Sequence, residues 1–294
     1  MINKILLVGG TGYIGRHLEE ALKNADFEVH ITGTINRNEK NYHRILFADE
    51  MSFQSLSGKT FDLMIILASK LDALGTTQLN HIDLKTNVTS YANFLEYAAQ
   101  YKLTKRIIYT SSMTVYGNQN KLPVEENGII NPVSTYGLSK YMAEIISSFY
   151  CNHHGVNGIG LRLPGIYGGE RKSGYIYDVL TKCAHNEDIT LYSNNLLYWE
   201  TININDLCNI MLRFIEAYDW KAVFQTFNVS YGEEIDFYET CYLIKSLLKS
   251  RSVITETGLK GYVPFYMSNT KMQRIIQINE SFKTSLNKYL LSIS

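Results

Sequence analysis

The sequence predicts an α/β fold in which a doubly wound parallel sheet is followed by a small, discontinuous C-terminal lobe. The first 160 residues alternate short apolar runs with longer amphipathic ones, which is typical of parallel strands joined by helical crossovers. Several short runs, such as Ile5–Val8 and Met64–Leu67, are continuously apolar, as strands buried on both faces must be. After about residue 165 the alternation becomes irregular, and this change indicates the second lobe.

The expected elements follow in order from this pattern. The short apolar runs predict strands at Lys4–Val8, Glu28–Thr32, Arg44–Ala48, Leu63–Leu67, Arg106–Thr110 and Gly158–Leu163. The amphipathic runs predict helices at His17–Asn24, Leu84–Tyr101, Tyr136–Tyr150, Ile176–His185, Asp206–Tyr218 and Phe237–Leu248. Two more strands are expected at Thr190–Tyr192 and Gln225–Val229. Sparse apolar positions after residue 249 predict only a small cap.

Composition argues against several classes of protein. The 294 residues include 28 Lys and Arg against 28 Asp and Glu, whereas a nucleic-acid binder normally carries a basic excess. The four cysteines form no C-x-x-C pair and the seven histidines have no H-x-x-x-H spacing, so neither a disulfide framework nor a metal site is expected. No segment approaches the ~18 apolar residues of a membrane span, and the N-terminal apolar run is too short for a signal peptide. We therefore expect a cytoplasmic protein that binds neither nucleic acid nor membrane.

A glycine-rich loop follows the first predicted strand and opens the first helix. Gly9 permits a tight turn, Gly12 lets a pyrophosphate approach the backbone, and Gly15 lets the helix pack closely on the strand. The helix N-terminus offers unpaired N–H groups to the phosphates. A turn without a ligand would share part of this pattern, but a strand before it and a helix after it favour dinucleotide binding. The sheet is thus expected to be of the Rossmann type, with the cofactor held by Gly9, Thr11, Gly12, Tyr13, Ile14 and Gly15.

The end of the second strand distinguishes the two nicotinamide dinucleotides. An NAD site normally places Asp or Glu there to bond the ribose hydroxyls, whereas this chain has Gly33, with Arg37 four residues later. Without the carboxylate a 2′-phosphate is not repelled, and an arginine can bind it in a forked geometry. NADP(H) is therefore favoured over NAD(H), although Arg37 can also be read as a solvated loop residue. Asp49, after the third strand, is expected either to meet the adenine or to cap a turn.

A second motif supplies candidate catalytic residues. Ser112 follows the predicted strand Arg106–Thr110, and the carboxyl ends of such strands face a ligand crevice. Tyr136 and Lys140 are four residues apart, which places them on one face of the predicted helix. A surface pair would have the same spacing, but the glycine loop and the strand-end serine favour catalysis. An ammonium beside a phenol stabilises the phenolate and lowers its pKa from ~10 toward neutrality.

Together these motifs resemble the extended short-chain dehydrogenase/reductase family, whose members include sugar-nucleotide epimerases, dehydratases and reductases. The resemblance runs from Ile5 to about Val229, and its further marks are Leu67-Ala68-Ser69, Asn87, Leu161-Arg162 and Ile204-Asn205-Asp206-Leu207. It implies that Tyr136 is the general acid/base, that Lys140 binds the nicotinamide ribose and tunes the tyrosine, and that Ser112 orients the substrate oxygen. It adds to the expected cofactor site Leu67, Ala68, Ser69 and Asn87, together with Tyr136 and Lys140.

The residues after Ser112 narrow the chemistry that the resemblance implies. Family dehydratases carry an Asp-Glu pair directly after the strand-end serine or threonine, but this chain has Met113-Thr114, so dehydration is not expected. Because the family's C4-epimerases retain NAD, Gly33 favours an NADP(H)-dependent reductase of a keto group on a nucleotide-activated (deoxy)sugar. An NAD-dependent nucleotide-sugar C4-epimerase is the alternative. A non-catalytic NADP(H)-binding regulator is less favoured because the serine, tyrosine and lysine are all present.

Substrate recognition departs further from the family pattern. Members that bind nucleotide diphosphates often have an arginine where this chain has Trp199, so Arg171 is expected to supply the missing charge. Trp199 is expected either to stack on a base or sugar, or to pack between the lobes. Met113, Thr114 and Gly165 complete the expected substrate site. A nucleotide sugar is the favoured substrate, and another small carbonyl compound remains an alternative.

The domain boundaries follow from the same pattern. Residues 1–165, with about 206–230, are expected to bind the dinucleotide, and residues 166–205 and 231–294 to form the substrate-binding lobe. Asp206 is predicted to be a helix N-cap rather than a catalytic residue. The predicted helices Leu84–Tyr101 and Tyr136–Tyr150 are apolar enough to pack across a two-fold axis in a homodimer, as in family dimers, although core burial would explain the same pattern.

Overall fold

The computed structural model describes residues 1–71, 81–119, 121–192, 197–221, 224–257 and 263–293. The chain divides into two compact units. Unit 1 comprises Met1–Asn118, Glu126–Leu163 and Cys208–Asn228, and unit 2 comprises Gln119–Glu125, Pro164–Leu207 and Val229–Ser294. Unit 2 thus includes a short segment near residue 120 that the sequence pattern did not separate. The assignment of cofactor to one lobe and substrate to the other stays a prediction.

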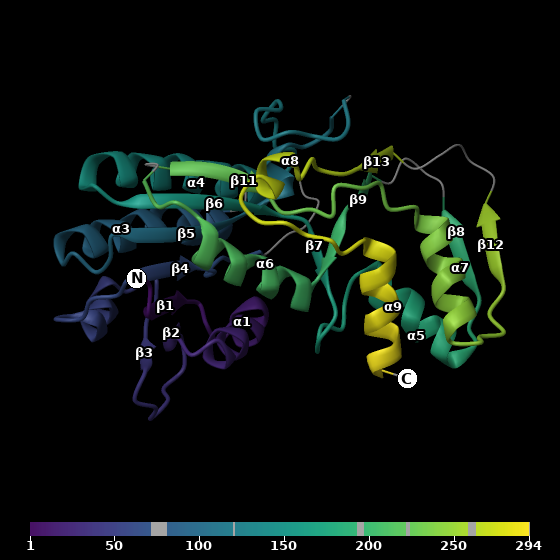
Figure 1. Ribbon diagram of the computed structural model, residues 1–294, viewed down its shortest axis with the longest axis horizontal. Coiled ribbons are helices and arrows are strands. Elements are labelled where there is room, and N and C mark those ends of the chain that lie inside the picture. The colour runs from purple at the N-terminus through teal and green to yellow at the C-terminus, as the bar shows by residue number, and fades with distance from the viewer. Residues whose placement is uncertain (72–80, 120, 193–196, 222–223, 258–262, 294) are drawn as a thin grey trace. The chain divides into compact units, whose positions relative to one another are not determined.

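Unit 1 contains a seven-stranded parallel sheet with the strand order β11-β6-β5-β4-β1-β2-β3 (Figure 1). In chain order its strands are β1 (Lys4–Val8), β2 (Glu28–Gly33), β3 (Tyr42–Arg44), β4 (Leu63–Ile66), β5 (Arg106–Ser112), β6 (Asn157–Leu163) and β11 (Phe224–Asn228). From β1 the chain first adds β2 and β3 on one side and then adds β4, β5, β6 and β11 on the other. The predicted doubly wound parallel sheet is thus confirmed. Because every pairing is parallel, the carboxyl ends of β1, β2, β4 and β5 lie at one edge.

Helices cover both faces of this sheet. They are α1 (Tyr13–Asn24), η1 (Glu50–Leu56), α2 (His81–Leu84), η2 (Lys85–Ser90), α3 (Tyr91–Gln100), η3 (Met113–Val115), α4 (Thr135–His154) and α6 (Ile204–Ala217). On one face Tyr91 and Phe94 of α3 and Ala143 of α4 join one apolar cluster with Met64 and Ile107 of the strands. α1 and the part of α6 from Cys208 lie on the other face (Figure 1). The continuously apolar strands are therefore buried from both sides, as their composition predicts.

The third strand lies earlier than predicted. It spans Tyr42–Arg44 instead of Arg44–Ala48, because the chain turns directly after Ile45. The Asp49 backbone N–H donates to the Leu46 carbonyl at 2.8 Å, which closes the turn before η1. The apolar residues Leu46 and Phe47 therefore belong to the turn and do not continue the strand.

In its described residues, unit 2 contains three short parallel pairs of strands and four helices besides the start of α6. β7 (Gly165–Tyr167) pairs with β10 (Thr201–Asn203), β8 (Ile189–Tyr192) with β12 (Ile254–Thr257), and β9 (Leu197–Trp199) with β13 (Val263–Phe265). The helices are α5 (Tyr175–His185), α7 (Phe237–Leu247), α8 (Thr270–Gln273) and α9 (Phe282–Ile293). The sequence pattern did not predict α9, although Phe282, Leu286 and Leu290 form its buried face at four-residue spacing.

Asp206 is not the helix N-cap that the sequence suggested. α6 begins at Ile204, and Asn203 Oδ1 accepts the N–H of Asn205 at 2.9 Å. The Asp206 carboxylate instead accepts the hydroxyl of Tyr231 at 2.6 Å and that of Ser285 at 2.5 Å. It therefore links the start of α6 to α9 and to the segment after β11 within unit 2.

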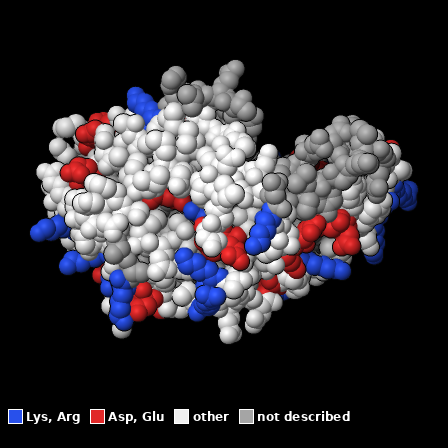
Figure 2. Space-filling model, turned by 90° about the horizontal axis from the view of Figure 1, so that it is seen from above, with Lys and Arg blue, Asp and Glu red and all other residues white. Residues whose placement is uncertain are grey.

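The charges and cysteines add little chemistry of their own. Lys and Arg are interspersed with Asp and Glu on the face in Figure 2, in keeping with the zero formal net charge. Within the described ranges, no helix is both long and apolar enough to cross a membrane, and no three His, Cys, Asp or Glu side chains are grouped to hold a metal ion. All four cysteines are buried, and burial raises the pKa of the Cys151, Cys208 and Cys241 thiols to about 12, so they are poor nucleophiles.

Candidate active site

The glycine loop forms the turn from β1 into α1. Gly9 has a φ of +90°, and a Cβ there would lie 2.8 Å from the Ala68 nitrogen, so this position requires glycine. A Cβ at Gly15 would lie 2.5 Å from a backbone oxygen of the same loop, whereas a Cβ at Gly12 would meet backbone at 3.3 Å. α1 begins at Tyr13, and its N-cap Gly12 makes no side-chain hydrogen bond; helix N-termini that follow a glycine-rich turn are suited to phosphate groups. The loop therefore fits the pyrophosphate of a dinucleotide.

The other loop residues lie around this turn. The Tyr13 ring lies edge-on to His17, with ring centroids 5.4 Å apart, and Ile14 is partly buried. The exposed Arg16 guanidinium donates to the Thr11 carbonyl at 2.9 Å. Arg16 adds a positive charge beside the glycine-rich turn. The sequence motif gave no signal for it, because the motif is defined by glycines.

Gly33 ends β2 in a crowded place. A Cβ there would lie 2.5 Å from Thr11 Cγ2 and 2.7 Å from the Tyr42 hydroxyl oxygen. A carboxylate at this position would therefore need Thr11 or Tyr42 to move. Arg37 stacks over the Tyr42 ring, 5.5 Å from its centroid, and its Nη1 lies 3.7 Å from Glu39 Oε1. Packing explains why this strand ends without a carboxylate, and the choice between NAD and NADP stays a prediction.

Asp49 caps η1, which is one of the two roles that the sequence left open. Its Oδ1 accepts the N–H of Met51 at 3.1 Å. At the end of β4, the backbone N–H groups of Leu67 and Ala68 both donate to the Val8 carbonyl at 2.9 Å. This shared acceptor holds the end of β4 against the start of the glycine loop. Ala68 thereby forms the wall that Gly9 approaches.

Asn87 joins three segments near this edge of the sheet. Its Oδ1 accepts the Lys70 N–H at 2.7 Å and the Ser69 hydroxyl at 3.2 Å. Its Nδ2 donates to the Lys70 carbonyl at 2.8 Å and to the Ser139 hydroxyl at 3.0 Å. Asn87 lies in the π-helical segment η2, which interrupts the helix predicted at Leu84–Tyr101, and π-helical turns are frequent at functional sites. The loop after β4 is thus fixed to α4.

The three candidate catalytic residues come from β5 and α4. Ser112 ends β5, and its Oγ accepts the N–H and the hydroxyl of Thr114, at 3.2 and 2.9 Å. These two bonds use the oxygen's lone pairs, so its own O–H remains as a donor. α4 begins against this turn, since a Cβ at Gly137 would lie 2.4 Å from the Thr114 carbonyl oxygen. Only glycine after Tyr136 permits this approach. Met113 is buried beneath the same turn.

Electrostatics at the tyrosine and lysine differ from the sequence expectation. Burial raises the pKa of the Tyr136 phenol, a hydrogen bond with Ser69 lowers it in part, and Asp83 raises it. Lys140 is buried, with its Nζ 4.5 Å above the centroid of the Tyr109 ring. Burial lowers the Lys140 pKa to about 7, and the nearby Glu144 carboxylate raises it. The Lys140 Nζ lies over Tyr109, and the expected lowering of the Tyr136 pKa by Lys140 stays a prediction.

The expected substrate residues in unit 2 are placed as follows. Gly165 is in β7, where its N–H donates to the Glu200 carbonyl at 2.9 Å. Arg171 is partly exposed, and its Nε donates to the Ser173 hydroxyl at 3.3 Å. Trp199 belongs to β9, but its side chain lies outside the described part of the chain. Their role in substrate binding stays a prediction.

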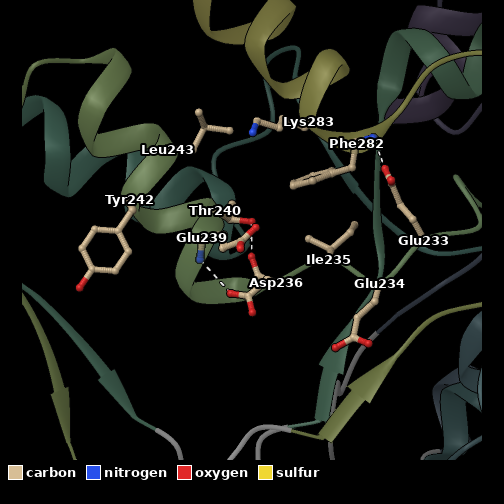
Figure 3. A pocket seen from close by; sticks show the side chains of 10 residues that line it. All are labelled: Glu233, Glu234, Ile235, Asp236, Glu239, Thr240, Tyr242, Leu243, Phe282 and Lys283. Carbon is tan, nitrogen blue, oxygen red and sulfur yellow. Dashed lines mark hydrogen bonds between the residues drawn. The ribbon is translucent and has the colours of Figure 1, made fainter.

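A cavity of about 490 Å³ lies elsewhere in unit 2, between α7 and the start of α9 (Figure 3). Apolar and hydroxyl side chains line part of it. The rest of the lining is four carboxylates and one lysine: Glu233, Glu234, Asp236, Glu239 and Lys283. Glu233 Oε1 accepts the Phe282 N–H at 2.5 Å, and Asp236 Oδ1 accepts the Glu239 N–H at 2.8 Å. The excess negative charge makes this cavity unsuited to a diphosphate.

The structure is a Rossmann-type sheet with a glycine-rich turn after β1 and with a serine, a tyrosine and a lysine where β5 ends and α4 begins. Residues 5–230 match the family described as the NAD dependent epimerase/dehydratase family. The chain belongs to this family. The resemblance inferred from the sequence is thereby confirmed, and family membership supports a nicotinamide dinucleotide as the cofactor class.

Individual relatives agree with this assignment. The chain is 27% identical over 252 residues to a Methanocaldococcus jannaschii protein named "Putative UDP-glucose 4-epimerase", covering 82% of this chain and 81% of the relative. It is 30% identical over 193 residues to N-acetyl-alpha-D-glucosaminyl-diphospho-ditrans,octacis-undecaprenol 4-epimerase of Escherichia coli O157:H7, covering 63% and 55%. A UDP-glucose 4-epimerase structure from Thermotoga maritima, solved with UDP-glucose, shares the fold at a TM-score of 0.82, with 21% identity and coverage of 99% and 98%.

Proposed function

We propose that the protein is a 4-epimerase of a sugar that carries a diphosphate ester, with a nicotinamide dinucleotide as cofactor. The observation that carries the proposal is the placement of Ser112, Tyr136 and Lys140 where β5 ends and α4 begins. These side chains suit reversible redox at one carbon, while Met113 and Thr114 offer no carboxylate for dehydration. Relatives named as 4-epimerases favour epimerisation over net reduction. The reductase favoured by the sequence alone therefore becomes the second candidate.

The side chains divide the proton chemistry between them. Tyr136 accepts the proton of the C4 hydroxyl as the C4–H bond breaks, which leaves a 4-keto sugar, and returns that proton to oxygen when the carbon is reduced from its other face. The nicotinamide supplies the hydride acceptor and donor when it is bound. Ser112 donates its free O–H to the same oxygen, since both of its lone pairs are used by Thr114.

Lys140 controls whether Tyr136 can act as a base. Burial raises the pKa of the Tyr136 phenol, so the neutral phenol is the resting form and proton abstraction needs a nearby positive charge. The Lys140 pKa is about 7, which means that its ammonium is present only in part near neutral pH. We expect epimerase activity to require the protonated lysine.

A specific observation keeps the NADP(H)-dependent reductase as a second candidate. Position 33 is glycine, so the carboxylate that normally bonds the ribose of NAD is missing from the end of β2. Arg37 stands on Tyr42 nearby and could meet a 2′-phosphate. An epimerase would instead hold NAD through the glycine loop and the residues after β4.

Cofactor release separates the two candidates. The purified protein is denatured, and the released nucleotide is measured by ultraviolet spectrum and mass. NAD in near-equimolar amount, with interconversion of UDP-glucose and UDP-galactose without added cofactor, supports the epimerase. A protein that carries no nucleotide, binds NADPH better than NADH and consumes NADPH with a keto sugar supports the reductase.

A tyrosine variant tests the assigned acid/base residue. Replacing Tyr136 with Phe removes the hydroxyl that moves the proton, so turnover should fall by about 10²–10⁴-fold while the released cofactor is unchanged. Tyr141→Phe on the same helix is the matched control and should retain activity. Activity of the Tyr136→Phe enzyme within a few-fold of wild type would contradict the assigned role.

The homodimer expected from the sequence is also part of this proposal. Met142, Ile145 and Phe149 of α4 are 37%, 52% and 60% exposed, and their spacing of three and four residues places them along one stripe of the helix. Exposed apolar stripes of this kind favour burial against a partner. We propose that a second copy of the chain covers this stripe.

A further inference from the structure

Helix α4 carries a third buried polar residue in line with the tyrosine and lysine. Tyr136, Lys140 and Glu144 follow one another at four-residue spacing, so they lie on one face of the helix. Glu144 is 4% exposed. Its Oε1 accepts the Ser111 hydroxyl at 2.5 Å and Arg162 Nε at 3.0 Å, and its Oε2 accepts Arg162 Nη2 at 2.8 Å. One carboxylate therefore joins α4 to β5 and β6.

The partners of Glu144 are themselves buried and hydrogen-bonded. Arg162 Nη1 donates to the Tyr116 hydroxyl at 2.7 Å and to the Glu126 carbonyl at 2.9 Å. The Tyr116 hydroxyl donates to Asn228 Oδ1 at 2.7 Å, and its ring lies 4.8 Å from the Arg162 guanidinium carbon. Burying an ion pair is costly unless its remaining hydrogen bonds are satisfied. This pair meets that condition, and it lies directly behind the candidate catalytic residues.

Glu144 lies next to residues that support two of the candidate catalytic groups, the Ser112 hydroxyl and the Lys140 ammonium. Ser111, which it holds, is the residue before Ser112 on β5. Lys140 is one helical turn away, and a carboxylate at that distance favours the ammonium. Among the residues that the structure describes, the charged or titratable groups around this face besides Glu144 include Tyr109 from β5, Arg162 from β6, Tyr91 from α3, and Asp83 of α2, which acts on Tyr136.

We propose that Glu144 is a positioning residue of the active site: its carboxylate fixes α4 against the end of β5, and its negative charge favours the ammonium form of Lys140. The catalytic consequence rests on the proposed function, whereas the charge relation between Glu144 and Lys140 does not. The lowered Lys140 pKa supports this inference, since a lysine poised near neutrality responds to any change in a neighbouring charge. Glu144 touches neither substrate nor cofactor in this proposal and acts through Lys140 and Ser111.

The test measures the titration of Lys140 directly. Lysine labelled with ¹³C at Cε is incorporated, and the Lys140 resonance is assigned with Lys140→Arg. In Glu144→Gln the titration midpoint should fall by roughly one pH unit or more, because the favourable charge is gone and Arg162 remains. In Arg162→Gln it should rise, because only the carboxylate remains. Tyr116→Phe breaks hydrogen bonds of the same network without changing a charge, and it should leave the midpoint unchanged.

The same variants separate failure of the inference from failure of the proposed function. The inference is overturned if the Lys140 titration midpoint is unchanged in Glu144→Gln or, where that variant does not fold, in Arg162→Gln. This holds whatever the activity of the variant. If the midpoint falls in Glu144→Gln and the alkaline limit of epimerase kcat falls with it, the positioning role is supported. If the midpoint moves in the variants but the wild-type protein has no epimerase activity, the charge relation is supported and the proposed function is refuted.

Discussion

Glu200 is a buried carboxyl whose environment raises its pKa. It is 1% exposed in unit 2, and its Oε2 accepts the Met267 N–H at 2.9 Å. Its Oε1 is in hydrogen-bond contact with the Ser230 hydroxyl. Ser230 also contacts the Met267 carbonyl, at 2.7 Å, and accepts the Gly232 N–H at 2.7 Å. The Ser230 hydroxyl therefore has one proton for two acceptors, Glu200 Oε1 and the Met267 carbonyl, so its hydrogen bond compensates only part of the cost of burying the Glu200 charge.

The pKa of Glu200 gives the size and sign of the effect on stability. Burial raises this pKa from 4.5 to about 8, against hydrogen bonds from Ser230, Met267 and Tyr231 that lower it. Between pH 4.5 and 8 the folded chain keeps the proton and the unfolded chain releases it. The free energy of unfolding should therefore fall by about 1.4 kcal/mol per pH unit across this window, and by up to about 5 kcal/mol in total. Above pH 8 the Glu200 contribution should be constant.

Urea unfolding of wild type and Glu200→Gln from pH 5 to pH 9 measures this contribution. Glutamine is neutral at every pH, so the stability of wild type relative to Glu200→Gln should fall as pH rises to 8 and then level off. Glu187→Gln, an exposed carboxyl nearby in the sequence, is the matched control and should keep the wild-type slope. A difference between wild type and Glu200→Gln that stays flat, or that rises with pH, would refute the proton assignment.

Three further predictions concern the cofactor site, its support and the expected dimer. Gly33→Ala places a Cβ 2.5 Å from Thr11 Cγ2, so we expect a loss of about 1–3 kcal/mol in stability and weaker dinucleotide binding by calorimetry; wild-type affinity would show that this turn adapts freely. Asn87→Ala leaves both backbone groups of Lys70 without their partner, which should cost about 1–3 kcal/mol in urea unfolding; an unchanged midpoint would contradict the bracing role. Phe149→Glu charges the exposed stripe of α4, so sedimentation should find a monomer where wild type is a dimer, and an unchanged sedimentation coefficient would exclude this stripe as the interface.

Local and continuous patterns made the sheet of unit 1 predictable. Lys4–Val8 was placed correctly at both ends, because five consecutive residues before a glycine loop fit a buried parallel strand and little else. Asn87 and Ser112 could be named from motif positions alone. The interruption of the helix around Asn87 could not, because a π-helical turn arises from the bonds that Asn87 makes to Lys70 and Ser139 in the folded chain.

Unit 2 was less predictable because its strands depend on distant partners. β9 and β13 are three residues long and pair across more than 60 positions of sequence, so neither has a pattern long enough to identify. The pairing of Glu144 with Arg162 was hidden for a different reason. A charged residue on an amphipathic helix is normally expected on the solvent side, and only the fold brings these two together behind Lys140.

Gly33 illustrates how one position can mislead. From the sequence, the absent carboxylate favours NADP, since that carboxylate is what normally selects NAD. In the structure, the side chains of Thr11 and Tyr42 already fill the space that a side chain at position 33 would need. The absence is thus explained by packing alone, and it carries less information about the cofactor than the motif suggests.

The fate of a deuterium label at C4 of the sugar tests the proposed epimerisation most directly. UDP-glucose deuterated at C4 is incubated with the purified protein without added cofactor, and the sugar products are analysed by mass and NMR. We predict interconversion with UDP-galactose and retention of deuterium at C4, because the hydride that leaves this carbon returns to it. If the diphosphate sugars offered are left unchanged while a keto sugar is reduced with consumption of NADPH, the protein is a reductase and the proposed epimerisation is wrong.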